Sequence, residues 1–448
     1  MALKDDFKSF CDAISLSNRD DMETSAGEIA KKLNNYYYDL SGDDKSHMYI
    51  VGSVGRYTAV DSCSDLDLLF DLPHDIYVKY NGYESNGQSA LLQDVKKVLQ
   101  ERYPKTEISG DGQVVVIDFN QYTVELVPGF KQDDNSFKYP DTHDGGSWKK
   151  TDPLKEQEEC DNAREASYGT FYDFCHMLRE WKNNIGFSFK GLLIDTLVHD
   201  HFEDNDWYAD KGYEDYLEIL ANLYEYLKEQ DKDQSFWYAL GSNQKIYNDD
   251  NSKFISKAKT AFNKLNGITN STEGINDTLR ELLGSDFPEA GEARNKTASF
   301  SRSVQKTRDP FVRGDNTEEF IWERFSVDIR YNVMIDCKVS QDGFRPFLLR
   351  GFLAKPFAHL KHNRRLDFYV EATNCPKPYK VYWKVRNVGR DAIRRKQIRG
   401  QINKGSYCID EHTSFNGPHY VECYIVKNGV CVARDHMYVP INNDDSLT

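Results

Sequence analysis

Two acidic residues in an alternating stretch are the clearest candidates for catalytic or metal-binding side chains. Asp65 and Asp67 alternate with leucines over 65–70, a pattern that predicts a strand. Because residues i and i+2 of a strand face the same side, the two carboxylates would lie side by side. Adjacent carboxylates repel one another unless a cation lies between them, and Mg²⁺ prefers hard oxygen ligands together with substrate phosphates. The pair therefore predicts a magnesium site that acts on a phosphate-bearing substrate.

A third acid, Glu125, is expected to complete this site. It stands among apolar residues in a predicted strand at 122–128. A lone buried carboxylate is costly, so Glu125 needs a partner, and the metal pair is a natural one. We therefore predict that Asp65, Asp67 and Glu125 are both catalytic residues and metal ligands.

Gly52 and Ser53 follow a predicted strand at 48–51 and are expected to bind phosphate. A strand that ends in a small-residue turn before a helix leaves backbone N–H groups pointing outward, where they can hold a phosphate. Phosphoryl transfer needs positioning and charge neutralisation more than covalent chemistry. Two metal ions would lower the pKa of an attacking hydroxyl and screen the leaving pyrophosphate, and Glu125 would assist proton removal.

The elements that must position these residues are of mixed type, followed by a helical region from about 155 to 285. Helical periodicity predicts helices at 23–40, 91–103, 168–184, 213–230 and 254–265. Two further strand patterns at 114–119 and 122–128 are joined by Asn120-Gln121, which favours a tight hairpin.

The chain changes character near residue 319, where β-rich segments bounded by turn residues predict a small sandwich. A polar stretch without periodicity precedes it. We expect a nucleotide-handling domain with a helical half at 1–290, a linker at 291–318 and a β-rich domain at 319–442. The fold class is α+β.

The composition excludes several classes of protein. With 57 Lys and Arg against 72 Asp and Glu, the net charge is −15, so we expect no strong nucleic-acid binding. The longest apolar runs are far too short to span a membrane, and the first residues are charged where a secretory signal would be apolar. We expect no membrane association, a cytoplasmic location, and nine cysteines that remain free thiols.

The segment GSVGRYTAVDSCSDLDLLFDLP (52–73) resembles the DNA polymerase β-like nucleotidyltransferases. Within them it is similar to the bacterial relatives of cyclic GMP-AMP synthase and oligoadenylate synthase, called CD-NTases. VELVPGF (124–130) resembles the strand of the third carboxylate, and WKKTDP (148–153) the start of the helical half. The resemblance covers about residues 1–290. It implies a polymerase β-like core of mixed sheet plus helices, although the third acid is Glu where many relatives have Asp.

This resemblance implies an enzyme that makes a cyclic di- or trinucleotide second messenger from NTPs, ATP or GTP or both, with Mg²⁺. The implied setting is bacterial antiphage signalling, with a separate effector protein that binds the messenger. Lys182 would lie on a helix that faces the triphosphate; the alternative is an ordinary surface lysine. Arg56 would either hold phosphate or cap the turn.

The tail carries a second resemblance, through segments such as HYVECYIVKNGVCVARDHMYVPI (419–441), to the C-terminal sensor domain of adenylyl/guanylyl cyclase and nucleotidyltransferase proteins. Residues 341–410 hold sixteen Lys or Arg and five Asp or Glu. A basic cluster there could take an anionic ligand, or it could be a solvated face. Its members are Arg394, Arg395, Lys396 and Arg399.

Two other functions remain open on the sequence. One is a transferase that places a single nucleotide on a protein, RNA or small-molecule acceptor. The other is a nucleotide-sensing scaffold without activity, against which the intact Asp65, Asp67 and Glu125 argue.

Overall fold

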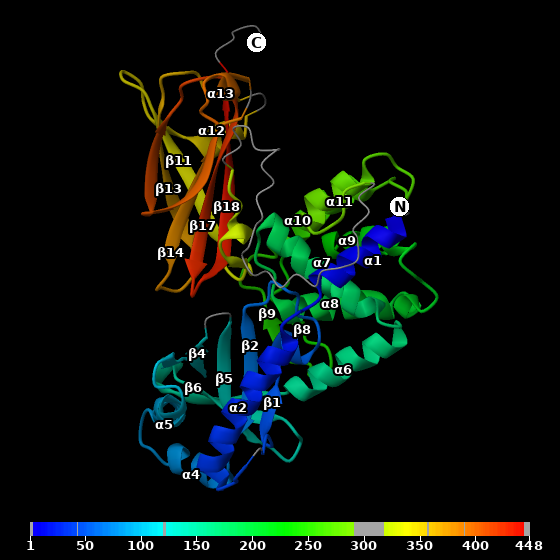
Figure 1. Ribbon diagram of the computed structural model, residues 1–448, viewed down its shortest axis with the longest axis vertical. Helices are drawn as coiled ribbons and strands as arrows, with labels where there is room; N and C mark the ends of the chain where they lie inside the picture. The colour runs from blue at the N-terminus through cyan, green and yellow to red at the C-terminus, as the bar shows by residue number, and fades with distance from the viewer. Residues whose placement is uncertain are drawn as a thin grey trace. The chain divides into compact units, whose positions relative to one another are not determined.

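The part of the chain that the structure describes forms two units in the computed structural model (Figure 1). Described are residues 3–42, 44–119, 122–290, 318–355, 358–388 and 390–442. The first unit takes the described residues up to 185 and those at 189–290, and the second takes 186–188 and 318–442. The predicted hairpin turn at Asn120-Gln121, and the predicted linker apart from its last residue, lie outside the described residues.

The first unit is built on a mixed sheet with the strand order β1-β2-β5-β4-β3. The strands β2 and β5 run parallel, and the other neighbours run antiparallel. Two further strands extend the sheet from β5 through β6 to β7. The strands are β1 (Met48–Ile50), β2 (Asp65–Asp71), β3 (Glu107–Asp111), β4 (Val114–Asp118), β5 (Thr123–Lys131), β6 (Phe137–Asp141) and β7 (Ser147–Thr151).

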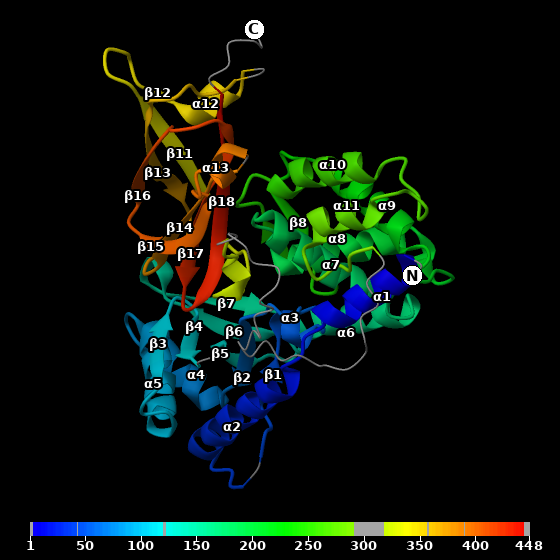
Figure 2. The same ribbon diagram turned by 45° about the horizontal axis from the view of Figure 1, so that its top comes forward.

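Helices cover one face of this sheet, as Figure 2 shows for α2 and α5. Ile29 and Leu33 of α2 and Leu92 and Val95 of α5 are buried in one cluster with the inward side chains of β2, β4 and β5. The alternation of β2 explains this, because its leucines at even positions face the helices. The helices of this half are α1 (Leu3–Ile14), α2 (Arg19–Tyr38), α3 (Gly52–Gly55), α4 (His74–Asn81) and α5 (Gly87–Arg102).

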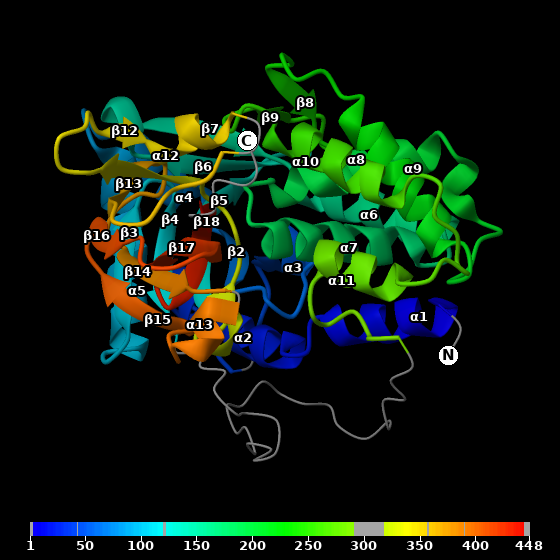
Figure 3. The same cartoon turned by 90° about the horizontal axis from the view of Figure 1, so that it is seen from above.

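The rest of the first unit is mainly helical, in agreement with the sequence pattern. Figure 3 shows α1 beside α7 and α11, and α7 is in contact with both α1 and α11. The helices are α6 (Pro153–Ala166), α7 (Thr170–Ile185), α8 (Gly191–Glu203), α9 (Tyr216–Lys228), α10 (Lys253–Leu265) and α11 (Ile275–Leu283). A short hairpin of β8 (Phe236–Tyr238) and β9 (Lys245–Tyr247) lies between α9 and α10 in the chain.

The second unit consists of two facing sheets, as the β-rich pattern predicts. One has the order β10-β18-β17-β14-β15 and the other β12-β11-β13-β16. Their inward side chains, among them Cys337, Phe368 and Ile425, share one buried cluster. The principal strands are β11 (Val333–Ser340), β13 (Arg365–Thr373), β14 (Lys380–Arg386), β15 (Arg399–Gly405), β16 (Cys408–His412), β17 (Gly417–Lys427) and β18 (Val430–Ile441). The shorter elements are β10 (Ser326–Val327), β12 (Phe347–Leu348), α12 (Leu349–Leu353) and α13 (Arg390–Arg394).

All nine cysteines are free thiols, as predicted. Among the described helices, none combines the length and the apolar composition that a membrane crossing requires.

Candidate active site

The register of β2 and β5 brings the predicted acids together. In this parallel pair the Cα atom of Asp67 is opposite that of Glu125, and Asp65 is opposite Thr123. Neighbouring strands lie about 4.8 Å apart, so Asp67 and Glu125 are direct neighbours although they are 58 positions apart in the chain. Asp65 lies two residues before Asp67 and therefore on the same face.

The three acids occupy the face of the sheet that the helices α2 and α5 do not cover. Leu66, Leu68 and Val124 point the other way and are fully buried in the main core. Asp67 and Glu125 are half-buried. A small separate cluster of apolar residues borders them on their own face. Its buried members are Val51, Leu69 and Phe137.

The Asp67 side chain lies against the turn at Gly52. A Cβ atom added to Gly52 would come within 1.8 Å of Oδ2 of Asp67. Gly52 also has a φ of +63°, which L residues rarely adopt. The backbone N–H of Val51 donates to the carbonyl oxygen of Asp67 at 2.9 Å, so strand β2 and the turn are joined directly. The structure thus brings the predicted glycine to a predicted catalytic acid.

Ser53 is the second residue of the four-residue helix α3 that follows β1. Its carbonyl oxygen accepts the N–H groups of Thr58 and Ala59 at 3.0 and 3.1 Å, which fold the next segment back over the turn. Its hydroxyl lies 3.9 Å from the thiol of Cys63. The first N–H groups of a helix have no partner within that helix, so this turn presents donors beside the acids.

The described side chains include no group of three or more His, Cys, Asp or Glu that is arranged to hold a metal ion as it stands. The three acids share a face and a register, but their side chains do not form a closed cage. Mg²⁺ is commonly held by one or two carboxylates together with substrate phosphates and waters, so an open pair such as Asp67 and Glu125 suits that ion.

Arg56, a predicted phosphate ligand, is directed into the protein interior. Its side chain is only 6% exposed. Its Nε donates to Oδ2 of Asp195 at 2.9 Å, and one terminal nitrogen lies 3.4 Å from Oε2 of Glu156. Of the two roles that the sequence left open, these contacts support the one in which Arg56 fixes the turn.

Asp195 on α8 is the centre of this buried group. Arg179 of α7 forms hydrogen bonds with both of its carboxylate oxygens, at 2.6 and 2.9 Å, and the Thr58 hydroxyl donates to Oδ2 at 3.0 Å. Burial opposes ionisation of Asp195, but Arg179 and Arg56 outweigh it and lower its pKa to about 2. Burial raises the pKa of Glu156 above its ordinary value, which its longer contact with Arg56 only partly offsets.

Lys182 lies on α7, where its side chain is 4% exposed and is not the surface lysine of the alternative interpretation. Its Nζ donates to Oδ1 of Asn183 at 3.0 Å. The Asn183 side chain in turn donates to the hydroxyl of Ser62 at 3.2 Å, in the loop that leads to Asp65. The helix of Lys182 therefore contacts the segment that precedes the acids.

Asp195 and Arg179 are not among the site residues predicted from the sequence. A charged residue within an apolar helical stretch could have indicated them, because such a residue is expected to be buried and a buried charge needs a partner. Asp195 lies within the segment GLLIDTLV, and Arg179 lies among the apolar residues of α7. The identity of the partners depends on how α7 and α8 pack, which the pattern of each helix alone does not reveal.

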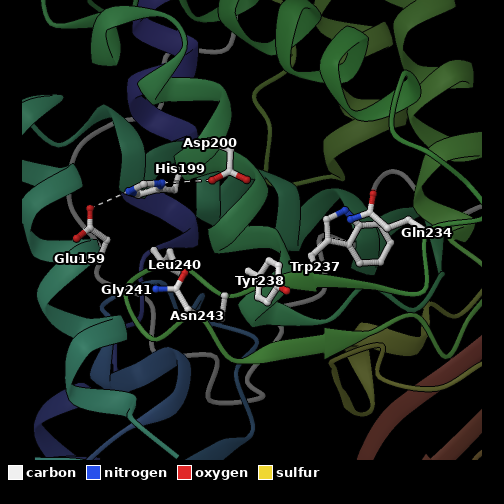
Figure 4. Close-up of a pocket in the computed structure, with 10 residues that line it drawn as sticks. Glu159, His199, Asp200, Gln234, Trp237, Tyr238, Leu240, Gly241 and Asn243 are labelled. Atoms are coloured by element: carbon white, nitrogen blue, oxygen red, sulfur yellow. Dashed lines mark hydrogen bonds and ion pairs between the residues drawn. The ribbon is translucent and has the colours of Figure 1, made fainter. Parts of the chain in front are cut away.

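A pocket of about 390 Å³ lies elsewhere in the helical half (Figure 4). None of its lining residues is a predicted site residue. His199 lies between two acids, with Nε2 at 2.9 Å from Glu159 and Nδ1 at 3.5 Å from Asp200. Burial opposes protonation of His199, but its close contacts with the carboxylates of Asp200 and Glu159 raise its pKa above the ordinary value.

The predicted basic cluster of the second unit is partly neutralised. Arg399 forms two hydrogen bonds with the carboxylate of Glu411, at 2.6 and 2.7 Å. Arg394 pairs with Asp391 at 2.7 Å, and the guanidinium of Arg395 lies 5.4 Å from the centre of the Phe415 ring. An anionic ligand at this cluster stays a prediction.

Comparison with protein families matches two parts of the chain. Residues 1–163 match the Second Messenger Oligonucleotide or Dinucleotide Synthetase domain. Residues 315–442 match the Adenylyl/Guanylyl and SMODS C-terminal sensor domain. A probable cyclic nucleotide synthase of Bacillus cereus (strain VD146) is 25% identical over 145 residues, which are 31% of this chain and 42% of that protein. The match thus spans less than half of that relative.

The fold is also similar to solved structures. The structure of CdnC of E. coli MS115-1 with ATP has 17% sequence identity and a TM-score of 0.48, over 64% of this chain and 99% of that one. CdnG of Bradyrhizobium diazoefficiens in complex with GTP has 10% identity and a TM-score of 0.46, over 63% and 95%. The two domain matches occur in the order that the sequence resemblance implies: a second-messenger oligonucleotide or dinucleotide synthetase domain is followed by a C-terminal sensor domain.

Proposed function

We propose that the chain is a magnesium-dependent nucleotidyltransferase that makes a cyclic di- or trinucleotide messenger from NTPs. The observation that carries this proposal is the pairing of Asp67 with Glu125 across two parallel strands, directly against the Gly52 turn. Acids and backbone donors so close together suit a reaction in which phosphate charge must be held and a hydroxyl must lose its proton.

Asp65, Asp67 and Glu125 would hold the magnesium, since all three offer hard carboxylate oxygens on one face of the sheet. When bound, magnesium supplies charge neutralisation for the phosphates and lowers the pKa of the attacking hydroxyl. Glu125 accepts or relays the proton of that hydroxyl. The apolar cluster of Val51, Leu69 and Phe137 limits water on the same face.

The Gly52–Ser53 turn binds the triphosphate of the donor nucleotide. Glycine at 52 lets the phosphates approach the backbone, and the first N–H groups of α3 are available as donors. Lys182 contributes positive charge from α7. Attack by a 2′- or 3′-hydroxyl of a second nucleotide on the α-phosphate forms the new ester bond and releases pyrophosphate. A second transfer closes the ring of a cyclic dinucleotide, and a cyclic trinucleotide requires a third, each transfer releasing one pyrophosphate.

The cellular role follows from the family and is part of the same proposal. The messenger binds a separate effector protein in bacterial antiphage signalling, and the sensor domain controls when it is made. The sensor match at residues 315–442 supports this assignment. Arg395 and Lys396, two exposed members of the basic cluster, are the candidate contact for an anionic signal.

Incubation of the purified chain with each NTP pair and Mg²⁺ tests the proposal. The expected product is a compact nucleotide that resists phosphatase and has the mass of a cyclic di- or trinucleotide. Label transferred to protein or RNA would instead indicate single-nucleotide transfer. Nucleotide binding without any product, under all activating conditions tried, would contradict the proposal and favour a sensing scaffold.

A further inference from the structure

The buried carboxylate of Asp195 connects the segment after the Gly52–Ser53 turn with the helix α7. The proposed reaction needs these two parts in a fixed relative position. Asp195 lies on α8 and has no exposed surface. It accepts hydrogen bonds from Arg56 and Thr58, which lie three and five residues after Ser53. It also accepts two hydrogen bonds from Arg179, on the helix that carries Lys182.

The bonds on the turn side act on the phosphate-binding backbone itself. The N–H of Arg56 donates to the carbonyl oxygen of Gly52 at 3.0 Å, and the N–H of Thr58 donates to that of Ser53 at 3.0 Å. The side chains of the same two residues end on Asp195. A shift of Asp195 would therefore shift both carbonyl groups and the turn between them.

The bonds on the helix side act on Lys182. Arg179 lies three residues before Lys182, so the two side chains are neighbours on one face of α7. A guanidinium that makes two parallel hydrogen bonds with a carboxylate fixes orientation as well as distance. Asp195 thus limits how far this turn of α7 can move away from the phosphate-binding turn.

The two arginines of the group are held by carboxylates within the protein. Arg56 contacts Asp195 and Glu156, and Arg179 contacts Asp195. A buried ion network that joins the segment after α3 to the helices α6, α7 and α8 suits a positioning role.

We propose that Asp195 is a positioning residue of the nucleotide site, which orients the Gly52–Ser53 turn and Lys182 toward the same triphosphate. This inference rests on the proposed function. Substitution at Asp195 would let the turn and α7 move separately, so the triphosphate would lose simultaneous contact with both. Affinity for a nucleotide triphosphate, rather than folding alone, should report this loss.

The test measures the Kd of a non-hydrolysable ATP or GTP analogue with Mg²⁺ by calorimetry, below the melting temperature of every variant. Asp195→Asn should weaken binding about tenfold or more, the effect of lost hydrogen bonds to a charged group. Thr58→Val, which removes one hydroxyl, should weaken it about threefold, and Thr58→Ser, which keeps the hydroxyl, should bind like the wild type.

Leu197→Ala is the matched structural control. Leu197 is buried on the same helix as Asp195 but its apolar side chain cannot hydrogen-bond to the turn, and its truncation costs about 2–5 kcal/mol of stability. Its Kd should equal that of the wild type. If Asp195→Asn does not fold, the comparison of Thr58→Val with Thr58→Ser tests the positioning role.

Wild-type affinity in both Asp195→Asn and Thr58→Val would overturn the positioning role and leave the proposed function intact. A Leu197→Ala variant as weak as Asp195→Asn would also overturn it, because the loss would then follow stability. A wild-type chain that binds no analogue would overturn both the proposed function and this inference.

Discussion

Gly52 and Asp67 fit so closely that residue 52 has no room for a side chain. An added Cβ would lie 1.8 Å from Oδ2 of Asp67 and 2.8 Å from its Cβ. Two separate constraints therefore apply at this position, the positive φ of the turn and the nearby carboxylate. The turn that is proposed to bind phosphate is thus in direct contact with the acid that is proposed to hold magnesium, so a change in one displaces the other.

Gly52→Ala should therefore lower NTP turnover by more than its loss of folding stability explains. The added methyl group must displace the Asp67 carboxylate, and a misplacement of about 1 Å can cost about 100-fold in rate. Gly267→Ala is the control, because Gly267 also has a positive φ but nothing lies within 4 Å of its added Cβ. Gly267→Ala should lose about 1–2 kcal/mol of stability because of its positive φ, and Gly52→Ala should lose more because its methyl group also meets Asp67. Equal turnover in the two variants would refute the steric link.

Arg179→Met should destabilise the chain strongly, because it removes one partner from a buried ion pair with Asp195. The expected loss is about 3–5 kcal/mol in urea unfolding. Arg164→Met is the matched control, since Arg164 pairs on the surface with Asp161 and Glu165. Its loss should stay below about 1 kcal/mol. If Arg179→Met lost as little stability as Arg164→Met, the buried network would contribute little to folding.

Asp173 should make stability fall as the pH rises from about 4 to about 6. Burial raises its folded pKa to about 6, whereas an exposed aspartate has a pKa of about 3.9. Between these values the folded chain binds more protons than the unfolded chain, so raising the pH favours unfolding. Asn cannot ionise, and Asp173→Asn should thus gain stability relative to the wild type over this range.

The gain should reach roughly 2–3 kcal/mol and level off above pH 6. Urea unfolding of both proteins at several pH values measures it. The hydroxyl of Tyr216, which donates to Asp173 at 2.6 Å, can still donate to an asparagine oxygen, so the hydrogen bond is kept. Two pH profiles that run parallel would contradict the raised pKa.

Lys182→Met should raise the KM for NTP about tenfold while the chain stays folded, because a positive charge near the triphosphate is lost. Lys190→Met is the control; Lys190 lies just before α8 and pairs at the surface with Asp249. Its KM should not change. An unaltered KM for Lys182→Met would remove Lys182 from the nucleotide site.

The sequence predicted those parts of the fold whose pattern is strong within one element. Strand β2 shows clear alternation, and α7 has apolar residues at helical spacing with Phe171, Phe174 and Leu178 buried. The strands β6 and β7 were not placed. Their segments FKYPD and SWKKT hold proline or adjacent lysines, and they are strands because each pairs with a neighbour.

The candidate site was predictable to the extent that it depends on residue type. The acids Asp65, Asp67 and Glu125 stood out because carboxylates alternate with apolar residues there. The contacts of Arg56 with Asp195 and Glu156 were not predictable, since they join residues more than 99 positions apart through helix packing. Local pattern carries no information about such partners.

The most direct measurement of the central claim compares NTP turnover in Asp67→Asn and Glu125→Gln with that in Asp71→Asn. Asp71 lies on the same strand, and its Oδ1 accepts the Lys131 N–H, a bond that asparagine can keep. With Mg²⁺ present, we predict cyclic product from the wild type and Asp71→Asn, and a loss of at least about 100-fold in the other two. Full turnover by Asp67→Asn or Glu125→Gln would contradict the account.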